Sequence, residues 1–258
     1  MKAFSPKQSL SIITVCFNSA LTIRSTIASV LCQDYKNFEY IIIDGGSLDD
    51  TVKIINEFKD HRIQLISKID EGLWDAMNKG VDIASGRYVT FLNSDDVYKD
   101  KHVITNSLYF IDENCLDLMF GFVDIYDEDL MKIIREYRVK ELSLNLLKVG
   151  VMPAHPGSII KRSFFKKLGG FHYNLDVPPD FYMLMSALLT KKARIKCLPK
   201  VLVNMRSGGL GNSSIKYKLD RQFRIINSLK LAGINVSIFK LLISKILYRR
   251  KEFFVEKL

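Results

Sequence analysis

Four apolar runs alternate with three amphipathic runs over the first hundred residues, and this alternation constrains the fold more than any other feature. Runs rich in β-branched and aromatic residues predict buried strands at 9–15, 38–44, 62–67 and 88–92. Apolar residues at helical spacing predict helices at 19–33, 51–58 and 73–84. Ser19 is a candidate N-cap for the first helix. Strands and helices that alternate in this way form a mainly parallel sheet with helices on its faces, so we predict an α/β fold.

The composition is typical of one large folded unit. The chain has 258 residues, of which 48% are hydrophobic and only six are proline, as in globular proteins. Its four cysteines form no CxxC pair, which indicates reduced thiols and not a disulfide framework or a zinc site. The N-terminus lacks a signal-peptide core, and no run reaches the roughly 18 apolar residues that span a bilayer. We therefore expect an intracellular protein that is not integral to a membrane.

Polar residues follow each predicted strand directly. Parallel strands end at one edge of a sheet, and ligands bind just beyond that edge. Asp95 and Asp96 follow the fourth strand, and two adjacent carboxylates suit a hard divalent cation. Gly45 and Gly46, after the second strand, permit close approach to the backbone, although neither GxGxxG nor a P-loop is present. Phe17, after the first strand, either stacks on a base or packs in the core, and alone it favours core packing.

Longer motifs resemble those of family 2 glycosyltransferases. The resemblance runs from about Ser9 to about Gly211 and is carried by SIITVCFNSA, IIIDGGSLDDT, DEGLWDAMNKGVDIASGRYVTFLNSDD and PAHPGSIIKRSFFKKLGGF…PPDFYMLMSAL. Members of this family are inverting enzymes of the GT-A fold, a Rossmann-like nucleotide-binding fold, and they use nucleotide-sugar donors. The nearest subgroup builds the repeat units of bacterial O-antigen, capsule and exopolysaccharide. The resemblance therefore implies a glycosyltransferase.

The resemblance also assigns donor-binding roles to residues near the predicted edge. Asp44 matches the acid that hydrogen-bonds the base, usually uracil, so the implied donor is a UDP-sugar. The other positions that match donor-binding residues are Thr14, Phe17, Asn18, Lys68, Asp70, Asn78, Lys79, Asn93, Ser94 and Asp95.

A metal site and a catalytic base are implied as well. Asn93, Ser94 and Asp95 occupy the family's DxD motif, so Asp95 is the expected ligand of Mn²⁺ or Mg²⁺, with Asp96 beside it. Because Asn93 replaces the first acid of the motif, the ion depends more on the two aspartates, on waters and on the donor diphosphate. Asp180 matches the base that takes the proton of the acceptor hydroxyl; the alternative is that it caps a helix after two prolines.

These roles divide the chain into a catalytic domain at 1–215 and a basic helical extension at 216–258. The nucleotide-sugar half covers about 9–98 and the acceptor half about 99–215. The implied reaction moves a hexose from the donor to a hydroxyl of a growing surface-polysaccharide repeat unit, carried on polyprenyl diphosphate.

The net charge of +10 is concentrated at the C-terminal end. Residues 216–258 contain eleven Lys or Arg and three Asp or Glu, which is a net +8. Within this segment, 236–254 predicts an amphipathic helix with a basic flank, which is typical of an element that binds an anionic membrane surface. The alternative is that the helix packs on the catalytic domain. We expect a cytoplasmic enzyme, peripheral on the inner face of the cytoplasmic membrane.

Two other classes of function remain possible from the sequence. A nucleotidyltransferase also binds nucleotides on an α/β sheet, but no basic GxGTR-like loop follows a strand here. A nucleic-acid-binding protein would explain the positive charge, but its basic residues should interleave with aromatic residues on the α/β body. They gather at one end of the chain instead, so we expect no nucleic-acid partner.

Three further features keep two interpretations each. His155 either contributes to acceptor binding or closes a turn before Pro156 and Gly157. Trp74 either supports a sugar or base, or packs in the core. The glycine-rich loop at 207–212 either closes over the donor, with Arg206 near phosphate, or is an ordinary linker.

Overall fold

The structure is a computed structural model that describes residues 10–208 and 215–236. In the first part, strands and helices alternate as predicted: β1 (Leu10–Cys16), α1 (Ile23–Leu31), β2 (Phe38–Asp44), α2 (Thr51–Glu57), β3 (Ile63–Ser67), α3 (Leu73–Ile83) and β4 (Tyr88–Phe91). The second part contains β5 (Val97–Tyr98), α4 (Val103–Asn114), β6 (Leu118–Tyr126), β7 (Ile133–Tyr137), α5 (Leu144–Leu147), η1 (His155–Gly157), β8 (Ser158–Lys161), α6 (Arg162–Lys167), α7 (Pro179–Leu189), β9 (Ile195–Arg206) and α8 (Ile215–Leu231). Most of the glycine-rich loop at 207–212 and of the amphipathic segment at 236–254 lies outside the described residues.

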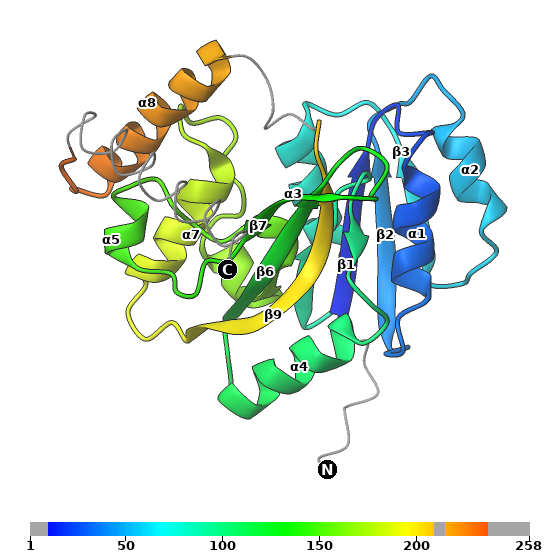
Figure 1. The fold of residues 1–258 in the computed structure, drawn as a ribbon, viewed down its shortest axis with the longest axis horizontal. Helices are drawn as coiled ribbons and strands as arrows, with labels where there is room; N and C mark the ends of the chain where they lie inside the picture. The colour runs from blue at the N-terminus through cyan, green and yellow to red at the C-terminus, as the bar shows by residue number, and fades with distance from the viewer. Residues whose placement is uncertain (1–9, 209–214, 237–258) are drawn as a thin grey trace.

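One mixed sheet connects the two predicted halves of the catalytic domain. Its strand order is β3-β2-β1-β4-β8-β6-β9-β5, and β7 pairs with β6 off this path. The first four strands in this order run parallel to their neighbours. β8 is antiparallel to both β4 and β6, whereas β9 runs parallel to β6. The result is a curled, mostly parallel sheet with helices on its faces, which confirms the predicted α/β class (Figure 1).

Helices cover both faces of the sheet because successive strand residues point to opposite sides. In β1, Leu10 and Ile12 belong to an apolar cluster with α1 and α4, while Ile13 and Val15 belong to a second cluster with α3, α6 and α7. Strands buried on both faces are rich in apolar residues, and all seven residues of β1 are buried, including the polar Ser11 and Thr14. A Cβ atom at Gly80 would lie only 2.6 Å from Ile13, so this glycine permits α3 to pack closely on β1.

Helix α1 begins later than the sequence predicts. Its N-cap is Thr22 and not Ser19, and residues 20–22 form a turn ahead of the helix. The Ser19 N–H donates to the Thr51 hydroxyl (2.7 Å), and the Ser19 hydroxyl lies 2.9 Å from that of Ser94. Because these contacts hold Ser19 between neighbouring loops, it joins loops at the carboxyl edge of the sheet instead of capping a helix.

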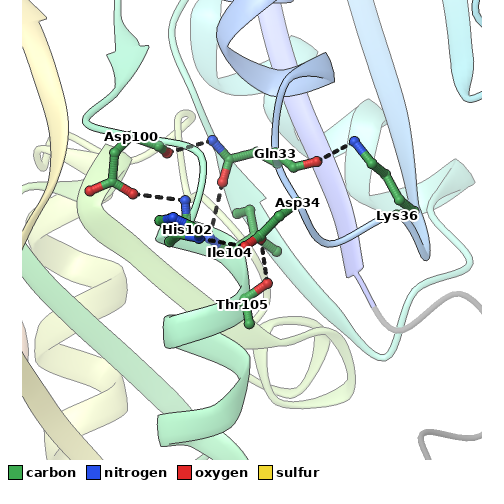
Figure 2. A network of polar contacts seen from close by, with 7 residues as sticks. All are labelled: Gln33, Asp34, Lys36, Asp100, His102, Ile104 and Thr105. Carbon is green, nitrogen blue, oxygen red and sulfur yellow. Dashed lines mark hydrogen bonds and ion pairs between the residues drawn. The ribbon is translucent and has the colours of Figure 1, made fainter.

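A polar network joins the end of α1 to the region where α4 begins (Figure 2). Gln33 donates from Nε2 to the Asp100 carbonyl (2.8 Å). Asp34 pairs with Nδ1 of His102 (2.5 Å) and accepts from the Thr105 hydroxyl (2.5 Å). These contacts fix the start of α4 against the end of α1.

Helix α8 packs beside α7, as Figure 1 shows in orange and yellow-green. A third apolar cluster lies between α5, α7 and α8 and consists of Leu147, Phe181, Met185, Ile225, Ile226 and Leu229. The basic segment predicted from residue 216 onward therefore begins with a helix that is docked on α5 and α7. In the part of the chain that the structure describes, no helix is both long and apolar enough to cross a bilayer.

Candidate active site

The carboxyl ends of β3, β2, β1 and β4 meet at one edge of the sheet, as the parallel register requires. The loops beyond this edge are bound to one another. The Asn18 N–H donates to the Ser47 hydroxyl (2.8 Å), and Asn18 Oδ1 accepts from the Leu48 N–H (2.9 Å). Asn18 has a positive φ of 49°, which asparagine tolerates better than most residues. The predicted polar edge is thus one continuous surface of connected loops.

Asp44 at the end of β2 is fully buried and accepts several hydrogen bonds. Its donors are the Ser67 hydroxyl (2.6 Å), the Gly46 N–H (3.2 Å), the Ser47 N–H (3.1 Å) and the Ser47 hydroxyl. Burial raises the pKa of Asp44, but the hydrogen bonds from Ser47, Ser67 and Gly46 outweigh it and hold the pKa below its ordinary value. Asp44 is therefore ionised, and a base N–H can reach it only if one of the two hydroxyl groups turns away.

The loop after β3 lies against the turn after β2. A Cβ atom at Gly45 would stand 2.9 Å from Asp70 Oδ2, so the glycine leaves room for that carboxylate. Lys68 is exposed beside it, and Ile69 is 80% exposed. Phe17, in the loop after β1, is 61% exposed and does not pack in the core. These loops therefore present a cation, a carboxylate and two apolar surfaces to a ligand.

Two predicted donor-binding residues support the site from within. Thr14 is fully buried, and its hydroxyl accepts from the Tyr40 hydroxyl (3.0 Å). Asn78 on α3 donates to the Phe171 carbonyl (2.8 Å) and accepts from the Phe171 N–H (2.9 Å). The side chains of Thr14 and Asn78 are thus engaged with the protein itself. Lys79 is more exposed, and its Nζ pairs with Asp75 Oδ2 (2.6 Å).

The turn after β4 is held from two neighbouring elements. The Thr26 hydroxyl on α1, fully buried, lies within hydrogen-bond distance of the carbonyls of Ser94 (2.9 Å) and Asp96 (2.8 Å). Arg206 at the end of β9 donates from Nη1 to the Asp95 carbonyl (3.4 Å) and from its N–H to Asp96 Oδ1 (3.2 Å). These contacts fix the backbone around Asp95 before any ligand binds.

The two adjacent carboxylates of this turn have different surroundings. Asp96 is 1% exposed and also accepts from Asn93 Nδ2 (2.9 Å). Burial and the neighbouring charge of Asp95 raise the pKa of Asp96 well above its ordinary value. Burial also raises the pKa of Asp95, which keeps partial exposure. Asp95 is therefore the carboxylate of the pair that can meet a ligand directly.

This turn fits a divalent cation. Asn93 Oδ1 is buried and has no hydrogen-bond partner among the described residues, next to a partly desolvated carboxylate. Carboxylate and amide oxygens are the ligands that Mg²⁺ prefers in proteins, and the ion usually completes its shell with waters and phosphates. Residues 10–208 and 215–236 contain no group of three or more His, Cys, Asp or Glu side chains that could hold an ion alone. An ion would therefore need the donor diphosphate or waters as further ligands.

Asp180 lies in the first turn of α7, whose N-cap is Pro178. It is 7% exposed, so it is not a solvated cap residue. Its Oδ1 accepts from the Phe181 N–H (2.8 Å), and its Oδ2 accepts from Arg221 Nη2 on α8 (3.0 Å). The carboxylate is thus fixed in orientation by two donors from different helices.

His155 and Trp74 connect this carboxylate to the carboxyl edge. Burial lowers the pKa of His155 to about 4, the Asp180 charge raises it and the Arg221 charge lowers it, so these groups lie within electrostatic reach. His155 Nε2 is buried and has no hydrogen-bond partner in the described part of the chain. The Trp74 ring packs against those of His155 (centroids 5.5 Å apart) and Phe171 (4.8 Å). Trp74 is therefore partly buried against the second apolar cluster, and it joins the start of α3 to His155.

Sequence reasoning missed three residues of this site. Thr26 reads as one more polar position in an amphipathic helix, and Arg221 is 41 residues away from Asp180 in a basic segment. Asp75 is 8% exposed, pairs with Lys79 (2.6 Å) and accepts from a tyrosine hydroxyl. Only Asp75 carried a signal, because it lies inside the DEGLWDAMNKG motif.

Solved structures share this fold. The chain is similar to S. aureus TarS 1–349 in complex with UDP-GlcNAc, with a TM-score of 0.67 and 19% identity over 86% of this chain and 66% of that one. It is also similar to the mannosyltransferase PcManGT from Pyrobaculum calidifontis in complex with GDP-Man and Mn²⁺, with a TM-score of 0.65 and 16% identity over 95% of this chain and 71% of that one. The fold is therefore that of the GT-A glycosyltransferases.

Sequence comparisons give the family. The profile described as Glycosyl transferase family 2 matches residues 11–170. The chain is 31% identical over 224 residues to the Escherichia coli UDP-Glc:alpha-D-GlcNAc-diphosphoundecaprenol beta-1,3-glucosyltransferase WfaP, covering 85% of this chain and 86% of that protein. It is 35% identical over 218 residues to a PGL/p-HBAD biosynthesis glycosyltransferase of Mycobacterium tuberculosis, covering 83% and 81%. The chain belongs to glycosyl transferase family 2.

Proposed function

We propose that this glycosyltransferase moves a hexose from a UDP-sugar to a hydroxyl of a lipid-diphosphate-linked saccharide, with inversion at the anomeric carbon. One observation carries the proposal: Trp74, at the start of α3, contacts the ring of His155, whose pKa is raised by the charge of the buried Asp180 carboxylate. A cation-binding turn and a separate buried carboxylate are the two groups that an inverting transfer needs. Membership of the family favours sugar transfer over nucleotidyl transfer or nucleic-acid binding.

The donor lies across the loops at the carboxyl edge in this proposal. Asp44 accepts from the uracil N–H, and Phe17 provides an apolar surface for the base. The residues that face the ribose, the diphosphate and the sugar are the exposed Asn18, Lys68 and Lys79 and the half-buried Asp70. The side chains of Thr14, Asn78 and Asp96 support the donor site without facing the ligand, because they form hydrogen bonds with other protein groups.

Asp95, with Asn93 and Ser94 in the same turn, would hold Mn²⁺ or Mg²⁺ against the donor diphosphate. The bound ion neutralises charge on the leaving UDP. Asp180 accepts the proton of the acceptor hydroxyl while the oxygen of that hydroxyl forms a bond to the anomeric carbon. The bond from that carbon to the β-phosphate oxygen breaks, and UDP leaves with the bonding electrons. A single displacement from the opposite face inverts the anomeric configuration.

The acceptor proposal rests on the activity for which a relative is named, since WfaP acts on a sugar linked to diphosphoundecaprenol. Such an acceptor stays at the membrane, so we place the enzyme in the cytoplasm, peripheral on the inner face of the cytoplasmic membrane. The catalytic unit covers 1–215, and the basic extension at 216–258 reaches the membrane through 236–254. Sedimentation with anionic vesicles tests this localisation.

A donor screen tests the proposed activity. UDP-sugars are compared with GDP- and dTDP-sugars by nucleotide release, with and without Mn²⁺, for the wild-type chain and Asp95→Ala. We expect UDP-sugars to turn over fastest, Mn²⁺ to accelerate the reaction, and Asp95→Ala to remain folded but lose this acceleration. Equal turnover of GDP-sugars, or a full response to Mn²⁺ in Asp95→Ala, would contradict the assignment.

A further inference from the structure

Helix α8 binds the loop that leads into α7 through polar side chains on one face. Arg224 pairs with Asp176 (Nε to Oδ1, 3.1 Å), and Asn227 donates to the same carboxylate (3.0 Å). Arg221, one turn earlier on α8, donates from Nη2 to Oδ2 of Asp180 (3.0 Å). Side chains of α8 therefore hold the segment that carries the proposed base.

The Arg221 contact differs from the others because its acceptor is buried. Asp180 is 7% exposed, whereas the Asp176 side chain is 75% exposed. A buried ion pair costs the desolvation of both charges, and an exposed pair contributes little to stability. The third apolar cluster, which holds Ile225, Ile226 and Leu229, already docks α8. Docking of the helix therefore does not explain why a cation is placed against Asp180.

The need to orient the Asp180 carboxylate explains why a cation lies against it. Asp180 Oδ1 accepts from the Phe181 N–H and Oδ2 accepts from Arg221, so two donors define the plane of the group. Each carboxylate oxygen can accept a second hydrogen bond, which leaves acceptor capacity for a substrate hydroxyl. The neighbouring His155 is neutral at neutral pH, because burial lowers its pKa to about 4. Arg221 is thus the charged side chain that directly contacts the Asp180 carboxylate among the described residues.

We propose that Arg221 is a positioning residue for the reaction, which holds the Asp180 carboxylate so that a free lone pair meets the acceptor hydroxyl. This inference rests on the proposed function, since it takes Asp180 as the general base. A base must lie within hydrogen-bond reach of the proton that it takes. The basic C-terminal part then contributes to catalysis through α8, in addition to any contact with a membrane.

A pair of matched variants tests the proposal in the full-length chain. Arg221→Met removes the cation beside the buried Asp180, and Arg224→Met removes a cation one turn later on α8 that pairs with the exposed Asp176 in the loop before α7. Nucleotide release is measured with UDP-glucose, or with the UDP-sugar that the wild-type chain turns over fastest. We expect Arg221→Met to lower kcat about 100-fold with an unchanged donor KM, since small misplacements of a reacting group cost that much. Arg221→Lys should recover part of the loss.

The control separates positioning from simple docking of α8. Arg221→Met should lower the melting temperature more than Arg224→Met, because it leaves a buried carboxylate without its cation. Both chains should stay folded at the assay temperature, and Arg224→Met should keep kcat within about threefold of wild type. Equal losses of kcat in the two variants would overturn the inference. Asp180→Asn is measured beside them: if it is inactive while Arg221→Met is fully active, the proposed base stands and the role of Arg221 is wrong. If Asp180→Asn is active, the proposed base fails, and the inference fails with it.

Discussion

His155 links the stability of the folded chain to pH. Burial holds its pKa at about 4 in the folded state, against the ordinary value of 6.5, while the Asp180 charge raises it and the Arg221 charge lowers it. The unfolded chain therefore takes up a proton that the folded chain does not, and protonation favours unfolding. The free energy of unfolding should fall as pH decreases from 6.5 to about 4, by at most about 3 kcal/mol. Above this window, His155 should contribute no pH dependence.

Denaturant unfolding at a series of pH values measures this contribution. His155→Gln carries no titratable ring, so its unfolding free energy should depend less steeply on pH between about 6.5 and 4 than that of the wild-type chain. The carboxylates that titrate at lower pH remain in both proteins and serve as an internal reference. Identical slopes in this window would show that the pKa of His155 is the same in the folded and unfolded states.

At the scale of elements, α8 ends in a glycine cap and the chain then stays docked. Gly233 has a φ of +73°, its N–H donates to the Lys230 carbonyl (2.9 Å), and the Ile234 N–H donates to the Leu229 carbonyl (2.8 Å). Such bonds satisfy the last carbonyls of a helix. Ile234 and Val236 pack against the third apolar cluster. A truncation that tests the basic segment should therefore begin after residue 236, so that this cluster stays covered.

The truncated chain provides the test of membrane binding. Each Lys or Arg near an anionic leaflet contributes about 1 kcal/mol, so the basic residues of 237–258 should bind the protein reversibly to a membrane. The full-length chain should sediment with anionic vesicles and be released at high salt, whereas a chain that ends at Val236 should stay in the supernatant with unchanged donor turnover. Equal sedimentation of both chains would contradict the membrane role of this segment.

The sequence predicted the elements that depend on local patterns and missed the features that depend on contacts between distant residues. β1 to β4 and α1 to α3 follow from the periodicity of each run, because buried strands and amphipathic helices have distinct local patterns. The start of α1 was misplaced, since the contacts that hold Ser19 come from Thr51 and Ser94. The antiparallel pairing of β4 with β8 joins Thr90 to Ile159, and no local pattern specifies such a partner.

In the candidate site, too, local patterns could be predicted from the sequence and contacts between distant residues could not. The polar residues after β1 to β4 could be predicted as neighbours, because parallel strands end at one edge. The different surroundings of Asp95 and Asp96 could not be predicted, since they depend on contacts with Arg206 from β9. Likewise, the partner of Asp180 comes from α8, which a division of the chain at residue 216 assigned to a different unit.

At the scale of the whole molecule, one curled sheet connects the two parts of the chain that carry the carboxylates of Asp95 and Asp180. Asp95 follows β4 in the predicted nucleotide-sugar half, and Asp180 lies in the first turn of α7 in the predicted acceptor half. The Trp74–His155 contact and the polar network of Figure 2 connect the halves, so their relative positions do not depend on one loop. Inverting transfer requires such a fixed geometry, because the base and the leaving diphosphate act on opposite faces of the sugar.

The most direct test of this account is the turnover of Asp180→Asn with its UDP-sugar donor and a lipid-linked acceptor. The amide keeps the shape of the side chain but cannot take the proton, so kcat should fall by about 100-fold or more. Binding of UDP, measured by calorimetry, should match that of the wild-type chain, because Asp180 acts on the acceptor. A near-normal kcat in Asp180→Asn would contradict the account and exclude this carboxylate as the base.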